Sequence, residues 1–176
     1  MRVVRNFGLS AGSHNEEASV FDQINGLPVH ALVVHAAVVF VPLLAVGAIV
    51  YAVIPRWRPR IGWAVLLLSV AAPGAALVAM LSGNELQARL LDQGISGRGA
   101  EIISDHSGFG KLTFWFTLGL GVVSLIMVGA TLRRTGSLPR AADVGLAVIM
   151  VALAAISGYY VFRTGDSGAT AVWGTY

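Results

Sequence analysis

Cysteine is absent from this chain, and charged residues are scarce, at 12% of 176 residues. Iron–sulfur clusters and thiolate zinc sites need cysteine, and covalent c-type haem attachment needs a Cys-x-x-Cys-His run, so the chain itself can hold none of them. The sequence also has no Gly-x-Ser-x-Gly turn, no phosphate-binding loop ending in Lys-Ser/Thr and no His-Glu-x-x-His helix. Nothing therefore indicates a hydrolase or a kinase.

The residues that are present are mostly apolar. Hydrophobic side chains make up 56% of the sequence and the mean hydropathy is +0.74, whereas soluble domains are about 45–50% apolar and about 25% charged. One membrane-spanning helix needs about 20 apolar residues. Runs of that length lie at about 29–54, 61–82, 109–132 and 142–162. The sequence predicts an all-α, polytopic membrane protein with a four-helix transmembrane domain.

That domain is expected to cover residues 27–176. The segment 1–26 is polar and lacks the continuous apolar stretch of a secretion signal, so it is interpreted as an N-terminal tail. His14 falls in this tail and is not assigned to a site.

Arginines between the apolar runs predict the orientation. The intervals 54–60 and 133–140 each hold three arginines, and short arginine-rich loops stay in the cytoplasm. Both termini and a long polar loop at 83–108 are then expected outside, in a multi-pass protein of the bacterial cytoplasmic membrane. The net charge of +3 is accounted for by these loops, so no nucleic-acid partner is expected.

Two features within the runs bear on packing. Pro42 and Pro73 lie near the middle of the first and second runs, where proline often bends a helix. Gly119 and Gly121 in the third run would let helix backbones approach closely. Such small-residue faces would hold the bundle together, and some could hold a partner subunit or a second copy of the chain.

Three histidines are the main candidates for chemistry. His30 begins the first run, His35 follows five residues later, and His106 precedes the third run. Five residues turn an ideal helix by about 140°, so His30 and His35 face different directions. The predicted topology brings His106 to the same membrane face as His30. Polar rings within membrane helices are costly, which favours a functional role.

Imidazoles on two apolar helices at one level are typical of membrane cytochromes, which hold a b-type haem between one histidine on each side of the iron. We expect His30 and His106 to be the axial ligands, with His35 as a substitute if the first helix is rotated. Lys111 and Arg163 are the candidate partners of the haem propionates.

A second hypothesis places a metal ion on the outer face. Glu85, Asp105 and Asp166 are expected on the same side as His106 and, with His30 and His35, could provide carboxylate and imidazole ligands for zinc, copper or manganese.

The order of these landmarks also resembles a known family. Segment 24–35 reads Ile-Asn-Gly-Leu-Pro-Val-His-Ala-Leu-Val-Val-His, His106 precedes the third span, and residues 165–169 read Gly-Asp-Ser-Gly-Ala after the fourth. Over about residues 22–174 this resembles the domain of unknown function 2231 family of uncharacterised bacterial membrane proteins. The resemblance implies that His30, His35 and His106 are candidate ligands.

Some members of that family look fused to Rieske or cytochrome-like domains, so the resemblance also implies a redox role. The chain departs from the family pattern at Asp166, where many relatives have another histidine. We expect no fourth imidazole ligand, and we expect Asp166 to be a hydrogen-bond partner of a ligand histidine.

The sequence thus favours an electron carrier with one b-type haem. Its partner would be a respiratory or redox membrane complex, with which it exchanges electrons. The main alternative is an accessory subunit without a cofactor, which packs against a larger membrane complex. The outer-face metal site is the second alternative, and an ion or solute carrier ranks last because the spans carry no buried charge. None of the leading hypotheses is an enzyme.

Overall fold

The computed structural model describes residues 23–24, 27–133 and 139–174. Two two-residue strands, β1 (Gln23–Ile24) and β2 (Leu27–Pro28), form a small antiparallel pair. Four helices follow, with one 3-10 turn between the first two. They are α1 (Val29–Val53), η1 (Pro55–Trp57), α2 (Arg58–Asp92), α3 (Arg98–Arg133) and α4 (Arg140–Trp173).

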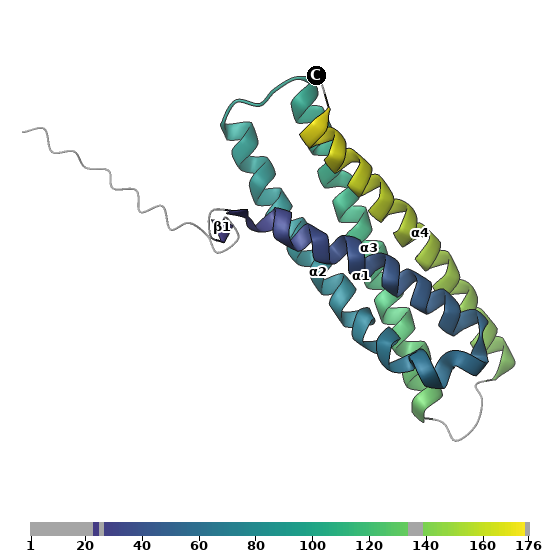
Figure 1. The fold of residues 1–176 in the computed structure, drawn as a ribbon. Coiled ribbons are helices and arrows are strands. Elements are labelled where there is room, and N and C mark those ends of the chain that lie inside the picture. The colour runs from purple at the N-terminus through teal and green to yellow at the C-terminus, as the bar shows by residue number, and fades with distance from the viewer. Residues whose placement is uncertain (1–22, 25–26, 134–138, 175–176) are drawn as a thin grey trace, which may run out of the picture.

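The four helices run alternately up and down and form a bundle (Figure 1). Each helix packs against its two neighbours in the order α1, α2, α3, α4 and back to α1, while α1 and α3 lie across the diagonal. The starts of α1 and α3 therefore lie toward one end, here called the histidine end. The starts of α2 and α4 lie at the other end, here called the arginine end.

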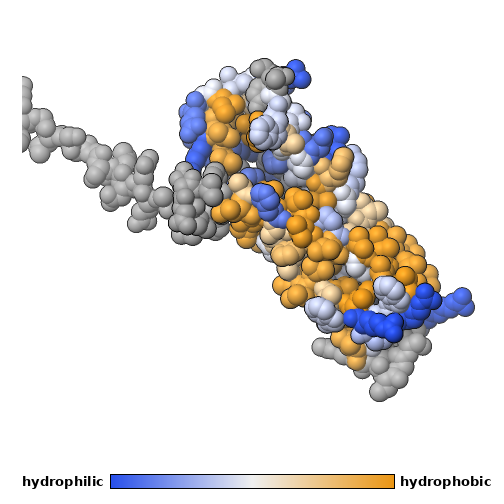
Figure 2. All heavy atoms as spheres, in the orientation of Figure 1, coloured by the Kyte–Doolittle hydropathy of each residue, from blue (hydrophilic) through white to orange (hydrophobic). Residues whose placement is uncertain are grey.

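All four helices are long and apolar enough to cross a membrane. The predicted all-α fold with four candidate spans is confirmed, and the orientation stays a prediction. Figure 2 shows apolar side chains along the length of the bundle and hydrophilic ones gathered toward its ends. Large apolar side chains such as Val46, Leu67 and Phe162 are exposed, as expected where lipid replaces water.

One expectation about the loops was wrong. Residues 83–108 do not form a long loop, because α2 continues to Asp92 and α3 already begins at Arg98. Polar composition suggested a loop, but helix-breaking geometry occurs only at Gly94 and Gly97, with φ of 92° and 61°, values that suit glycine. The second and third helices therefore extend beyond the predicted apolar runs, and past the start of α1 (Figure 1).

Of the two glycines of the third run, Gly121 allows the close approach that the sequence predicted, whereas a Cβ added to Gly119 would meet only the side chain of Leu153, at 3.7 Å. A Cβ added to Gly121 would lie 2.6 Å from the backbone oxygen of Ser69 and 3.0 Å from Cγ of Pro73, both in α2. Pro42 and Pro73 both lie inside their helices. At Gly121, therefore, α3 packs directly on the proline-containing turn of α2.

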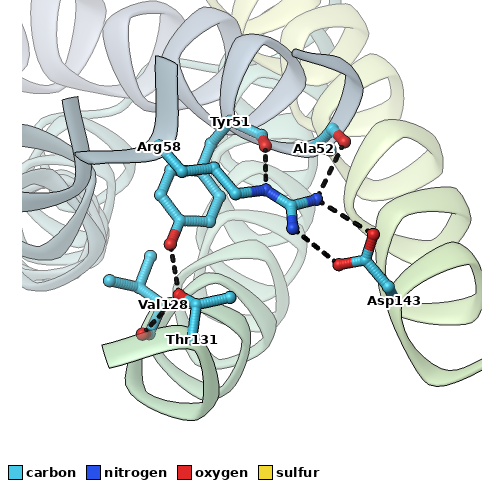
Figure 3. A network of polar contacts seen from close by, with 6 residues as sticks. All are labelled: Tyr51, Ala52, Arg58, Val128, Thr131 and Asp143. Carbon is cyan, nitrogen blue, oxygen red and sulfur yellow. Dashed lines mark hydrogen bonds and ion pairs between the residues drawn. The ribbon is translucent and has the colours of Figure 1, made fainter. Parts of the chain in front are cut away.

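A polar network closes the arginine end (Figure 3). Arg58 forms an ion pair with Asp143 at 2.7 Å and donates to the backbone oxygens of Tyr51 at 3.0 Å and Ala52 at 3.3 Å. Helix ends leave carbonyls without intrahelical partners, so Arg58 satisfies the last turn of α1 while it joins α2 to α4.

The buried positions of α1 and α3 follow one pattern. His106 follows His30 at a fixed distance in the sequence. Moving each buried residue of α1 along the sequence by that same distance leads to a buried residue of α3. Among the described residues, Phe114 is the one buried position of α3 outside this pattern. The buried residues of α1 are Ala37, Val41, Leu44, Ala45, Ala48, Tyr51 and Ala52, and their counterparts are Thr113, Thr117, Leu120, Gly121, Ser124, Met127 and Val128.

Candidate functional site

His30 and His106 lie side by side at the histidine end of the bundle. Their ring centroids are 6.1 Å apart and the two ring planes are nearly perpendicular, at 88°. His30 belongs to the first turn of α1, and His106 lies about 12 Å along α3 from its first residue. The pair therefore sits between helices on opposite corners of the bundle, as the predicted topology required.

The ring of His30 is fixed by α2. Its Nδ1 lies 3.0 Å from the backbone oxygen of Ala79 and 3.2 Å from the hydroxyl of Ser82. Because a carbonyl oxygen only accepts, Nδ1 carries the proton and donates it. The Ser82 hydroxyl in turn donates to the backbone oxygen of Val78 at 2.8 Å, so its oxygen can share the proton of Nδ1.

The ring of His106 is fixed in the same way by α4. Its Nδ1 lies 3.0 Å from the backbone oxygen of Thr164 and 3.1 Å from the hydroxyl of Ser167. The Thr164 hydroxyl contacts that of Thr113 at 2.9 Å, which joins α4 to α3 about two turns further along from His106. His106 thus donates its Nδ1 proton to a neighbouring helix, and its neutral form is the Nδ1–H tautomer.

Each histidine ring packs directly against a glycine of a neighbouring helix. A Cβ added to Gly83 would lie 2.9 Å from Cε1 of His30, and a Cβ added to Gly168 would lie 2.9 Å from Cε1 of His106. Real Cβ atoms essentially never come closer than 3.0 Å to such an atom. Glycine at these two positions therefore makes the space that the imidazoles occupy.

The second ring nitrogen of each histidine is available. In the described part of the chain no hydrogen bond reaches Nε2 of His30 or of His106. With Nδ1 protonated, Nε2 of a neutral imidazole carries the lone pair that binds a metal. The site offers two such nitrogens, each on a ring whose orientation is fixed.

His35 is not part of this pair. It is exposed on α1, and its Nδ1 contacts the backbone oxygen of Ala31, in its own helix, at 2.6 Å. The difference in direction from His30 agrees with the rotation of five residues along a helix.

The two predicted cations are placed differently. Arg163 is half-buried next to Thr164, with its guanidinium 4.7 Å from the ring centroid of Phe109. Its Nε is buried and has no hydrogen-bond partner among the described residues. Lys111 is exposed on α3. Arg163 therefore lies next to the residue that accepts the Nδ1 proton of His106, and its Nε is the donor that could bind a further group.

The carboxylates do not gather around the histidines. Asp105 and Asp166 are exposed and Glu85 is half-buried, and in the parts of the chain that the structure describes no three His, Cys, Asp or Glu side chains form a group that could hold a metal ion. Asp166 is also not the partner of His106, contrary to expectation, because the Thr164 carbonyl and Ser167 take that role.

Comparison with known families agrees with the resemblance seen in the sequence. A family model described as "Predicted membrane protein (DUF2231)" matches residues 26–175. The chain belongs to the DUF2231 family. No curated protein and no solved structure matches it.

The part of the chain that matches the DUF2231 model contains the whole histidine pair with its supporting residues, since these lie between His30 and Gly168. Sequence reasoning found both histidines but missed Ala79, Ser82, Gly83 and Thr164. The dipeptide Ser-Gly occurs at 82–83 near the end of α2 and at 167–168 near the end of α4, but also at 96–97, 107–108 and 157–158. It marks these positions only when the two halves of the chain are compared.

Proposed function

We propose that this DUF2231 protein is a membrane electron carrier that binds one b-type haem between His30 and His106. One observation carries the proposal: two imidazoles lie together, and each donates its Nδ1 proton to a backbone carbonyl. Histidines that bind metals typically donate their second ring nitrogen in this way, which fixes the tautomer and the ring orientation. Membrane spans seldom bury two such rings without a function.

The spacing of the rings supports the same ligand. Bonds from a metal to imidazole nitrogen are about 2.0–2.1 Å long, so two imidazoles on opposite sides of one metal atom have centroids about 6 Å apart. The observed separation is 6.1 Å. The residues present therefore suit a metal centre with two open positions, and haem iron is such a centre.

The chain supplies binding, orientation and charge. The carbonyls of Ala79 and Thr164 accept the Nδ1 protons, so Nε2 is the nitrogen without a proton in the neutral form of each ring. Arg163 has a buried Nε without a partner in the described residues, so its guanidinium suits a propionate carboxylate. When bound, haem supplies a one-electron iron couple.

The position in the bundle bears on the partner. Both histidines lie toward one end of the helices, which the arginine distribution predicts to be the extracytoplasmic side. An electron donor or acceptor would then dock at that face of the bacterial cytoplasmic membrane, in a respiratory or other redox complex.

The test is spectroscopic. The protein is purified in mild detergent from haem-replete cells, and oxidised and dithionite-reduced spectra are recorded with a pyridine haemochrome assay. We expect a Soret band, sharp reduced α and β bands, and haem close to one per chain. His30→Ala and His106→Ala should each lose the Soret band while the protein still inserts in the membrane.

His35→Ala is the matched control, since this exposed ring lies on the same helix as His30 and should leave the spectrum unchanged. A colourless wild-type protein would refute the haem proposal and leave the accessory-subunit hypothesis, to be pursued by identifying what copurifies. Retention of the Soret band by both His30→Ala and His106→Ala would refute the ligand assignment.

A further inference from the structure

The two histidines are held by the same parts in the same geometry. In each case Nδ1 lies 3.0 Å from a backbone oxygen, and the hydroxyl of a serine three residues further on lies at 3.2 Å for Ser82 and 3.1 Å for Ser167. The glycine after each serine would place a Cβ 2.9 Å from Cε1 of the ring. The two sets of distances are nearly identical, although the two sets of residues come from different helices.

The agreement extends along the helices. The sequence offset that takes Ser82 to Ser167 also takes three buried residues of α2 to the three buried residues of α4. The other buried residues of α2 correspond to half-buried positions of α4, and the buried residues of α1 all correspond to buried residues of α3. The hairpin of α1 and α2 and the hairpin of α3 and α4 are therefore two repeats of one unit. Val65, Ser69 and Ala72, which are buried in α2, correspond to Met150, Ala154 and Ser157, which are the buried residues of α4.

The relation between the repeats follows from their direction. Both hairpins begin at the histidine end and return to it, so the axis that relates them runs along the bundle, as in transporters built from parallel repeats. His30 and His106 are equivalent residues, and the axis passes between their rings.

We propose that Ser82–Gly83 and Ser167–Gly168 are two copies of one imidazole seat, and that these four residues position His30 and His106 so that the pair binds a ligand with two equivalent coordination positions on opposite sides. The inference rests on the proposed function for the identity of that ligand as haem. The seats themselves are properties of the chain and can be measured without any ligand.

Glycine is required at the seat because of the ring above it. An alanine methyl at Gly83 or Gly168 would push the imidazole away from the carbonyl that accepts its proton. The histidine would then lose its fixed tautomer and its orientation toward the partner ring. Supporting residues of this kind typically change metal affinity by about 10–100-fold.

Removing either serine hydroxyl should have a smaller effect, and the direction of its effect on the reduction potential of bound haem can be predicted. Each hydroxyl oxygen shares the Nδ1 proton with a carbonyl, which makes the imidazole a stronger electron donor. Ser82→Ala and Ser167→Ala should leave the rings in place but raise the reduction potential of bound haem, because a weaker donor stabilises the oxidised iron less. The two shifts should be similar in size.

The experiment compares Gly83→Ala and Gly168→Ala with two matched controls, Gly74→Ala in α2 and Gly165→Ala in α4. A Cβ added at either control position meets nothing within 4 Å. Histidine ¹⁵N spectra of the haem-free protein report the tautomer of each ring, with signals assigned from His30→Ala and His106→Ala. Haemin titration then gives the affinity.

We expect Gly83→Ala to remove the Nδ1–H tautomer signal of His30 alone, and Gly168→Ala that of His106 alone. Each should weaken haemin binding by at least about tenfold, with similar losses, while both controls match the wild type. Seat variants that keep both tautomers, or a loss at one seat only, would overturn the proposal. If a seat variant fails to insert, Ser82→Ala and Ser167→Ala decide instead: each should shift the Nδ1 signal of its own histidine by a similar amount without changing the tautomer, and a shift at one seat only would overturn the proposal.

The two proposals fail separately. If the wild type binds no haemin but its tautomers respond as expected, the haem function is wrong and the paired seats stand. If haemin binds and the glycine variants bind it like their controls, the seats are wrong and the haem function stands.

Discussion

Tyr51 of α1 and Thr131 of α3 are joined by a hydrogen bond of 2.5 Å across the diagonal of the bundle. The Thr131 hydroxyl donates to the backbone oxygen of Val128 at 2.8 Å, so the tyrosine hydroxyl is the donor to Thr131. Tyr51 is only 2% exposed. This bond fixes the distance between two helices that otherwise contact each other little, near the arginine end and far from the histidines.

Tyr51→Phe should lower the free energy of unfolding by about 0.5–1.5 kcal/mol, because it removes one buried hydrogen bond and keeps the packing of the ring. Denaturant titration in mixed micelles measures the change. Tyr159→Phe is the control, since Tyr159 is exposed on α4 and should change stability little. Equal effects of the two variants would contradict the role given to Tyr51.

Arg58→Ala should destabilise the protein by roughly 1–3 kcal/mol, and more than Asp143→Asn does, because Arg58 also donates to two carbonyls of α1. Arg58→Lys should fall between wild type and Arg58→Ala, since an ammonium cannot reproduce the planar fork of donors. The double variant should cost less than the sum of the single ones. Strict additivity in the same unfolding assay would show that the pair at 2.7 Å carries no coupling.

Gly121→Ala should destabilise the bundle by about 1–3 kcal/mol through overpacking, because the new methyl group would meet the backbone of Ser69 and the ring of Pro73. Gly129→Ala lies two turns further along α3 with nothing within 4 Å of the added Cβ. It should be neutral or slightly stabilising, since alanine favours a helix more than glycine does. A neutral Gly121→Ala would mean that α2 can move away from α3 at no cost.

If the chain binds haem as proposed, Arg163→Gln should lower the reduction potential of that haem, because removing a positive charge at the level of His106 stabilises the oxidised form. Lys111→Gln should have a smaller effect, since exposed charges are screened by salt. Potentiometric titration of both variants at low and high ionic strength measures the difference. The assignment of Arg163 fails if Lys111→Gln produces the larger shift.

Much of the fold could be predicted from the sequence, because long apolar runs and arginine-rich turns reflect the bilayer directly. The same topology argument brought His30 and His106 to one end. The outer parts of α2 and α3 were missed because their polar composition resembles a loop, and composition alone does not show that the helix continues almost to Gly94.

The seats of the histidines could not be predicted in the same way. A carbonyl such as that of Ala79 has no sequence signature, and its direction depends on how α2 is rotated against α1, which side-chain packing decides. Asp166 was predicted to be a histidine partner because it is charged, but its side chain is exposed and a carbonyl and a serine hydroxyl contact His106 instead. The repeated Ser-Gly dipeptide was visible, but its meaning depends on a comparison of the two halves of the chain.

The ion pair between Arg58 and Asp143 at the arginine end depends on having both hairpins in one polypeptide. The sequence offset that takes Ser82 to Ser167 also takes Arg58 to Asp143, so these two are equivalent positions carrying opposite charges. A dimer of identical hairpins would have to place two arginines, or two aspartates, against each other. Because both hairpins belong to one polypeptide, the two copies can differ in sequence, and the bundle has matching histidines at one end and complementary charges at the other. Those charges distinguish the two halves and disfavour assembly of like with like.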